Sequence, residues 1–164
     1  MWEMQDLHST FDRGPLTSPG KAAILMPEIL LAEDNPADVY LIREALREHG
    51  VDYPVRVVWD GKEVLQFISD ASSGDHSLGL IILDLNLPRH DGIEVLQKLR
   101  ETEGFAQVPV VVLTSSDSPR DRVVASELGA ACYVRKPSSL EQFLSLGGIF
   151  KRLLTSTNTT AEGQ

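Results

Sequence analysis

Polar side chains that could do chemistry stand directly after four short apolar runs of this sequence. Glu33 and Asp34 follow the first run, Asp84 follows the third, Thr114 follows the fourth, and Lys136 lies just beyond the fifth. Carboxylate oxygens are the ligands that Mg²⁺ prefers, with waters completing its octahedron. An ammonium and a hydroxyl beside such an ion can hold a phosphoryl group, because both donate hydrogen bonds to its oxygens. If the five residues meet, the chemistry they suggest is phosphoryl transfer.

Asp84 is the candidate nucleophile, because four apolar residues come before it and should make its position rigid. Its carboxylate would attack phosphorus while the metal ion and Lys136 neutralise the charge on the equatorial oxygens. Taken singly, each residue could equally have an ordinary structural role. An acid after a strand is usually a turn former or a helix cap, and Tyr133 is more often a core residue than part of a switch. The functional interpretation therefore depends on the joint arrangement at one edge.

Apolar runs and amphipathic segments alternate along the chain and must form the elements that position these side chains. The runs predict strands at residues 29–32, 55–58, 80–83, 108–113 and 132–134. The helices begin at recognisable caps: Asn35 with Pro36, the capping boxes Asp60–Glu63 and Asp91–Glu94, Ser118, and Ser139. Gly50 and Gly129 end two of these helices. The last helix, opened by Ser139, contains Gly147 and Gly148, which should weaken it by about 1 kcal/mol each.

The alternation of strand and helix predicts an α/β fold with a doubly wound parallel sheet. Continuous apolar strands must be covered by helices on both faces. In such a sheet ligands bind beyond the carboxyl ends of the strands, so the polar residues would all be delivered to that edge. The boundaries predicted from composition are a flexible leader at 1–26, a single domain at 27–154 and a frayed polar tail at 155–164.

Composition narrows the class of function. The chain has 164 residues, with 15 Lys and Arg against 24 Asp and Glu, and a formal charge of -9, so it should repel nucleic-acid backbones and anionic membranes. Its single cysteine, Cys132, cannot close an internal disulfide, and its histidines are not spaced as zinc ligands. No apolar stretch approaches the ~20 residues of a membrane span, and the N-terminus does not resemble a signal peptide. These features predict a cytoplasmic protein that binds neither nucleic acid nor membrane.

Five strings of this sequence, and the helix after the last of them, resemble the receiver domain of two-component response regulators. The strings are ILLAEDNPADVYLIREAL, VVWDGKEVLQFI, LIILDLNLPRHDGIEVLQKLR, VPVVVLTSSD and ELGAACYVRKP, and the resemblance covers roughly residues 27–153. EDNPAD and LDLNLPRHDG are most similar to the small single-domain regulators encoded with bacterial phytochromes and related sensor kinases. The resemblance implies a flavodoxin-like receiver fold with five parallel strands in order 2-1-3-4-5, which agrees with the pattern above.

The resemblance also implies a role for each residue at the strand ends. Asp84 would accept a phosphoryl group from the phosphohistidine of a sensor histidine kinase. Asp34, Asp84 and the backbone carbonyl of Asn86 would hold Mg²⁺, while Glu33 would orient metal-bound waters. Lys136 would contact the phosphoryl oxygens. The protein would be a signalling phosphoacceptor, with self-catalysed phosphotransfer and autodephosphorylation, and not an enzyme acting on a separate substrate.

A switch and a set of partners follow from the same resemblance. Thr114 would move to hydrogen-bond the phosphoryl group, and Tyr133 would follow inward and remodel a protein-interaction face. Pro137 would follow Lys136 through a cis peptide bond. The partners implied are a sensor histidine kinase, of phytochrome type on the closer resemblance, and a downstream protein, a phosphotransfer partner or a second copy of the chain.

Three other classes of protein stay open from the residues alone. A phosphohydrolase with an Asp84 nucleophile would need an aspartate two residues later as general acid, and Asn86 cannot protonate a leaving group. A flavodoxin-type binding module would need a phosphate-cradling loop where Glu33 and Asp34 stand. A phosphorylation-independent scaffold would not need the complete set of acids, threonine and lysine.

Overall fold

A five-stranded parallel sheet forms the centre of the molecule. The computed structural model describes residues 26–71 and 76–161, with side chains up to Thr157; residues 1–25 of the predicted leader and 162–164 of the predicted tail lie outside these ranges. The strands are β1 (Glu28–Ala32), β2 (Val55–Val58), β3 (Leu78–Leu83), β4 (Val110–Thr114) and β5 (Cys132–Arg135). Their order is β2-β1-β3-β4-β5 and every pair is parallel, which confirms the predicted fold.

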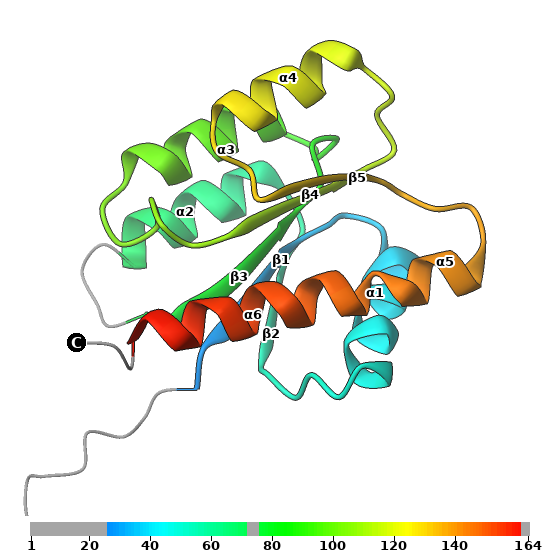
Figure 1. The fold of residues 1–164 in the computed structure, drawn as a ribbon. Coiled ribbons are helices and arrows are strands. Elements are labelled where there is room, and N and C mark those ends of the chain that lie inside the picture. The colour runs from blue at the N-terminus through cyan, green and yellow to red at the C-terminus, as the bar shows by residue number, and fades with distance from the viewer. Residues whose placement is uncertain (1–25, 72–75, 162–164) are drawn as a thin grey trace, which may run out of the picture.

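Helices cover both faces of this sheet. They are α1 (Pro36–Glu48), α2 (Gly61–Ala71), α3 (Gly92–Glu101), α4 (Pro119–Glu127), α5 (Leu140–Ser145) and α6 (Gly147–Ala161). Figure 1 shows α2, α3 and α4 on one face and α1, α5 and α6 on the other. Within the described residues, no helix is long and apolar enough to cross a membrane.

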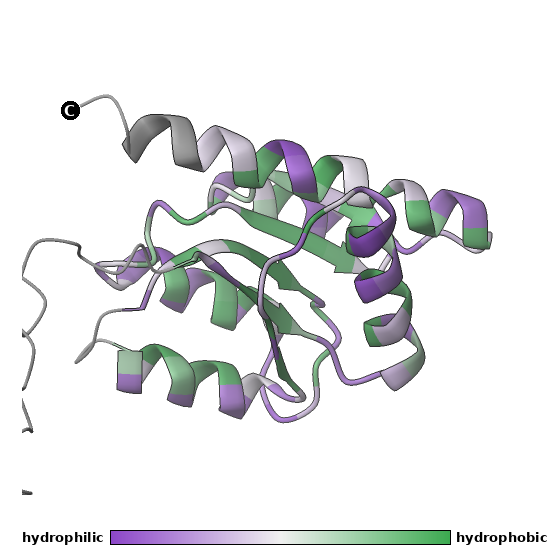
Figure 2. Ribbon diagram, turned by 90° about the horizontal axis from the view of Figure 1, so that it is seen from below, coloured by the Kyte–Doolittle hydropathy of each residue, from purple (hydrophilic) through white to green (hydrophobic). Residues whose placement is uncertain are grey.

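The core consists of two apolar layers, one on each face of the sheet. Leu30 and Ala32 pack with the buried side chains of α2, α3 and α4, whereas Ile29 and Leu31 pack with those of α1, α5 and α6. All residues of β3 and β4 are buried. Figure 2 shows the hydrophobic strands between helices that carry hydrophilic residues. Because the central strands are packed on both faces, the residues that follow them have little freedom to move.

The helices begin at the predicted caps. The side chains of Asn35, Asp91, Ser118 and Ser139 accept hydrogen bonds from backbone N–H groups in the first turns of α1, α3, α4 and α5. At α2 the Asp60 carboxylate accepts from the Glu63 N–H at 2.8 Å, and the Glu63 carboxylate accepts from the Trp59 N–H at 2.7 Å. These caps set the first residue of each helix, and therefore the length of each loop at the carboxyl edge.

The C-terminal helix differs from its prediction in two ways. It is divided at Leu146 into α5 and α6, and both parts contact α1. At the division Gly147 lies so close to α1 that a Cβ there would be 2.1 Å from the Ala45 carbonyl oxygen. α6 also continues to Ala161, well into the predicted tail. Its Leu154 is buried, and the hydroxyls of Thr155, Ser156 and Thr157 donate hydrogen bonds to backbone carbonyls one turn back.

Candidate functional site

The carboxyl ends of the strands bring the predicted residues to one edge of the sheet, which can be followed from strand to strand in Figure 1. Glu33 and Asp34 follow β1, Asp84 follows β3, Thr114 ends β4 and Lys136 follows β5. The convergence expected from the sequence is confirmed.

Backbone hydrogen bonds continue past the ends of the strands and hold two of these residues. The Asp84 N–H donates to the Ala32 carbonyl at 3.0 Å, and the Lys136 N–H donates to the Thr114 carbonyl at 2.8 Å. The side chains of Asp84 and Lys136 therefore leave from backbone that is still part of the sheet ladder.

Glu33, Asp34 and Asp84 form an acidic group that could hold a divalent cation. One carboxylate oxygen from each lies within 4.8 Å of the others. Glu33 and Asp84 are only 1% and 3% exposed, while Asp34 is exposed to solvent. An all-oxygen donor set of this kind suits a hard divalent cation. The geometry of the acidic group therefore fits a divalent metal ion.

Lys136 is the cation of the site. Its Nζ lies 2.7 Å from Glu33 Oε2, 2.8 Å from Asp38 Oδ2 and 2.7 Å from Asp84 Oδ2. Burial lowers the pKa of Lys136, but hydrogen bonds to the three carboxylates raise it by more, so this pKa stands above its ordinary value. Lys136 therefore stays charged throughout the physiological range.

Glu33 is an acid that resists ionisation. Burial raises the pKa of its carboxyl from 4.5 to about 7, against the hydrogen bonds from Lys136 and the Asn35 N–H, which lower it. The negative charge of Asp84 adds to the rise. Near neutral pH this carboxyl is consequently close to its midpoint.

Asp38 is the member of the site that reasoning from the sequence missed. It lies in the first turn of α1, where an acid is expected simply because it interacts favourably with the helix N-terminus. Its contact with Lys136 joins residues 98 positions apart in the chain. The sequence offered one signal, namely that Asp38 lies in the same polar segment as Glu33 and Asp34.

Asn86 links the acid of β3 to the hydroxyl of β4. Its backbone N–H donates to Asp84 Oδ1 at 2.9 Å. Its side-chain Nδ2 donates to Thr114 Oγ1 and to Ser115 Oγ, both at 3.2 Å. The Asn86 carbonyl was predicted as a metal ligand and its side chain as a group unable to act as general acid, but these contacts of the amide were not predicted. The amide holds the Thr114 hydroxyl, which is completely buried.

Tyr133 is connected to Thr114 through Ser116. The Ser116 N–H donates to Thr114 Oγ1 at 3.2 Å, and the Tyr133 hydroxyl donates to the Ser116 carbonyl at 3.4 Å. The Tyr133 ring is partly buried, with the Arg122 guanidinium 4.7 Å from its centroid. A movement of Thr114 would therefore disturb contacts on which Tyr133 and α4 depend.

The predicted cis peptide bond between Lys136 and Pro137 is wrong for this structure. No cis peptide bond occurs among residues 26–71 and 76–161, so the bond is trans. A trans bond before proline is favoured unless the surrounding contacts reverse a small difference in free energy.

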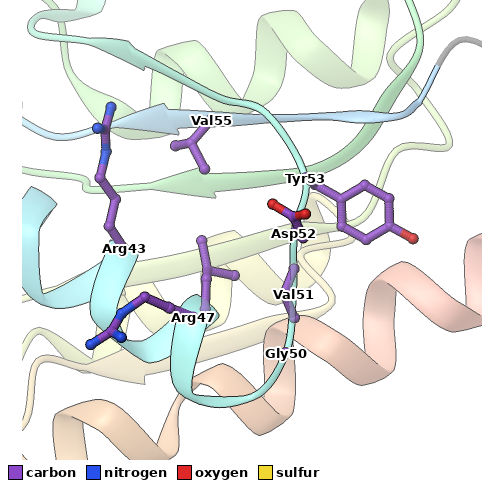
Figure 3. A pocket seen from close by; sticks show the side chains of 8 residues that line it. Arg43, Arg47, Gly50, Val51, Asp52, Tyr53 and Val55 are labelled. Atoms are coloured by element: carbon purple, nitrogen blue, oxygen red, sulfur yellow. The ribbon is translucent and has the colours of Figure 1, made fainter.

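A separate hollow lies at the amino end of β2, whereas the residues of the candidate site lie at the carboxyl ends of the other strands. It has a volume of about 450 Å³ and is lined by α1 and the α1–β2 loop, with Arg43, Arg47, Asp52 and Tyr53 around it (Figure 3). None of the acidic group or its lysine lines it. The candidate site is therefore the polar edge and not this hollow.

Comparison with known proteins points to one family. The model for the response regulator receiver domain matches residues 29–146. The response regulator Rcp1 of Synechocystis sp. is 35% identical over 120 residues, which are 72% of this chain and 82% of Rcp1.

Solved structures show the same relationship. The phosphorylated cyanobacterial phytochrome response regulator RcpA is similar with a TM-score of 0.72 and 34% identity, over 80% of this chain and 96% of RcpA. The Mn²⁺-bound form of Rcp1 is similar with a TM-score of 0.70 and 33% identity, over 78% of this chain and 94% of that one. Together with the sheet order and the site, these matches show that the chain belongs to the response regulator receiver family of two-component signalling, alongside the phytochrome-associated regulators.

Proposed function

We propose that this protein is a phosphoacceptor in a two-component phosphorelay, in which Asp84 takes a phosphoryl group from the phosphohistidine of a sensor histidine kinase. The observation that carries the proposal is the surroundings of the buried Asp84 carboxylate. It lies 2.7 Å from the Lys136 ammonium and forms an acidic group with Glu33 and Asp34. A nucleophile, a cation and a set of metal ligands are thus together at the end of the central strand.

The transfer itself needs few groups. An oxygen of Asp84 forms a bond to phosphorus while the bond between phosphorus and the donor's imidazole nitrogen breaks. The electron pair of the broken bond stays on that nitrogen, and a donor protonated on its other ring nitrogen leaves as neutral imidazole. Asp84 becomes an acyl phosphate, and Lys136 is close enough to donate a hydrogen bond to the new phosphoryl oxygens. In autodephosphorylation, water would later attack the phosphorus, which releases inorganic phosphate and returns the Asp84 carboxylate.

Mg²⁺ is the metal proposed for this site. Asp34, Asp84 and the backbone carbonyl of Asn86 would hold it, and Glu33 would orient its waters. When bound, the ion supplies positive charge that offsets the negative charge of the phosphoryl oxygens. Two observations support this assignment: the oxygens of the acidic group fit a hard cation, and the similar Rcp1 structure is a Mn²⁺-bound form.

The switch would begin at Thr114. In the structure its hydroxyl accepts hydrogen bonds from the Asn86 amide and the Ser116 N–H, and these must break before it can reach a phosphoryl group. Tyr133, bonded to the Ser116 carbonyl, would then lose its present support and turn inward. The surface of α4, β5 and α5 would change its affinity for a protein partner.

The partners proposed follow from the relatives. Because RcpA is described as a phytochrome response regulator, we expect the kinase to be a phytochrome-type photoreceptor. The output would be a downstream protein, a phosphotransfer partner or a second copy of the chain, and the relay would operate in the cytoplasm. The unit proposed to do this is residues 27–154.

The direct test is phosphorylation of the purified protein by acetyl phosphate, read by intact mass. We expect one phosphoryl adduct that requires Mg²⁺ and disappears in Asp84→Asn. Asp91→Asn is the matched control, because Asp91 is an N-cap on the exposed start of α3, and it should keep the adduct. An adduct on Asp84→Asn, or none on the folded wild-type protein with Mg²⁺, would overturn the proposal.

A further inference from the structure

We propose that Asp38 is a positioning residue for Lys136. This inference rests on the phosphoacceptor function proposed above. Lys136 has three N–H donors, and each has a carboxylate acceptor, from Glu33, Asp38 and Asp84. All three distances are 2.7–2.8 Å, and the lysine side chain is only 13% exposed. The ammonium is therefore held from three elements of the fold at once.

Asp38 differs from the other two acceptors because phosphorylation of Asp84 and binding of a metal ion would both leave its carboxylate unchanged. Asp84 would no longer offer a free carboxylate, because one of its oxygens would be bonded to phosphorus. Glu33 belongs to the acidic group that could hold a metal, whereas Asp38 does not. Asp38 is thus the acceptor that stays unchanged before and after the transfer. With Glu33 it would hold Nζ in place, so that the third N–H stays directed at whatever Asp84 carries.

The start of α1 holds Asp38 rigidly enough for this role. The Asn35 N–H donates to Glu33 Oε1 at 3.0 Å, and the Asn35 side chain accepts from the Ala37 N–H at 3.0 Å. The first turn of α1 is thereby joined to the end of β1, and the Asp38 side chain is 18% exposed. Two carboxylates in a fixed relation restrict the four-carbon stem of lysine, which is otherwise flexible.

Asp38 could also act in two simpler ways, and each leads to a different prediction. An acid in the first turn can simply stabilise the helix N-terminus, in which case only the stability of the protein would depend on it. Its charge can also simply repel an anionic phosphodonor, in which case Asp38→Asn and Asp38→Ala would both raise the affinity for the donor. A positioning role predicts instead that Asn, which still offers an oxygen acceptor, preserves the function that Ala loses.

The first measurement is direct NMR observation of the Lys136 ammonium in the full, ¹⁵N-labelled chain. A buried ammonium with three acceptors exchanges its protons slowly and should give a resolved cross-peak, unlike the exposed Lys62, Lys98 and Lys151. Lys136→Arg assigns the peak. We expect Asp38→Ala to broaden or remove it and Asp38→Asn to retain it, whether or not the protein accepts phosphate.

The second measurement is the rate of phosphorylation at saturating acetyl phosphate with Mg²⁺. We expect Asp38→Ala to be about tenfold slower and Asp38→Asn to be close to wild type. Glu94→Gln removes an exposed first-turn acid from α3 and should change neither the rate nor the peak.

These results separate the two proposals. An unchanged cross-peak and rate in Asp38→Ala would overturn the positioning role, as would equal effects of Asn and Ala. If Asp38→Ala does not fold, Asp38→Asn decides, because a loss of the peak in that folded variant would show that the charge alone matters. A wild-type protein without the adduct would overturn the phosphoacceptor function, whereas a cross-peak that Asp38→Ala removes and Asp38→Asn retains would still support the contact between Asp38 and Lys136.

Discussion

Four carboxylates and one ammonium occupy the end of the sheet, so negative charge exceeds positive charge among these side chains. The acids are Glu33, Asp34, Asp38 and Asp84, and the ammonium is that of Lys136. Burial raises the pKa of Glu33 to about 7, and the nearby negative charge of Asp84 contributes a smaller part of that rise. A bound divalent cation would relieve the imbalance, which is the physical reason for an acidic group at a site that receives phosphate.

The raised pKa of Glu33 predicts a pH dependence of stability. In the unfolded chain the carboxyl ionises near 4.5, and in the folded protein near 7, so between these values the folded state binds more protons. Glu33 therefore contributes most to stability below pH 4.5, and this contribution is lost as pH rises to about 7. The measurement is the free energy of unfolding in urea with a chelator present, for wild type and Glu33→Gln.

We expect the wild-type value minus the Glu33→Gln value to fall by roughly 1 kcal/mol or more from pH 5 to pH 7.5. Glu94→Gln, which removes an exposed acid, should follow the wild-type curve. A difference that is constant with pH would show that Glu33 ionises normally in the folded protein.

Among the elements, the junction of α1 with α6 shows how one residue type can decide a packing distance. A side chain at Gly147 would meet the Ala45 carbonyl oxygen at 2.1 Å and His49 Nδ1 at 2.4 Å. At the neighbouring Gly148 a Cβ would meet only the His49 ring, at 3.7 Å, which is ordinary contact. The packing against α1 therefore requires glycine at position 147 but not at position 148. α1 also carries Asp38, so its position against α6 matters for the site.

Alanine at the two glycines should have opposite effects. Gly147→Ala should lower the free energy of unfolding by about 1–3 kcal/mol, because backbone of α1 must move to admit the methyl group. Gly148→Ala should raise it by about 0.5–1 kcal/mol, because alanine favours a helix and meets no obstacle. Urea unfolding of both variants beside wild type measures this. Equal effects of the two substitutions would show that α1 and α6 do not pack as closely as described.

For the molecule as a whole, stability should be linked to the occupancy of the site. A ligand that binds only the folded state adds RT ln(1 + [L]/Kd) to the free energy of unfolding. The acidic group is assembled from the ends of β1 and β3 and does not exist in the unfolded chain. Mg²⁺ should therefore stabilise the entire fold.

We expect the free energy of unfolding to rise by about 1.4 kcal/mol for each tenfold increase in Mg²⁺ above its Kd. The response of Asp84→Asn to Mg²⁺ should be much smaller, because the substitution removes the negative charge of one proposed ligand. Asp91→Asn should retain the wild-type response. Equal responses of Asp84→Asn and wild type would show that Asp84 is not a metal ligand.

Short-range patterns in the sequence were enough to predict the sheet, the helix starts and the edge at which the polar residues meet. Continuous apolar runs must be buried on both faces, and a cap such as Asn35 acts on the next few residues, so both are visible in a short stretch of chain. Because parallel strands all end at one edge, Glu33, Asp84 and Lys136 could be placed together without knowledge of a single contact.

Features that depend on contacts between distant segments became visible only in the folded molecule. Asp38 looked like an ordinary first-turn acid until α1 brought it to Lys136, and Gly147 looked unfavourable until its approach to Ala45 was seen. The extension of α6 to Ala161 likewise could not be predicted from local sequence. The trans bond before Pro137 is the form that local chemistry favours, and it departs only from what the family resemblance implied. Local patterns indicate which faces are apolar, whereas these features arise from the distances at which packed elements meet.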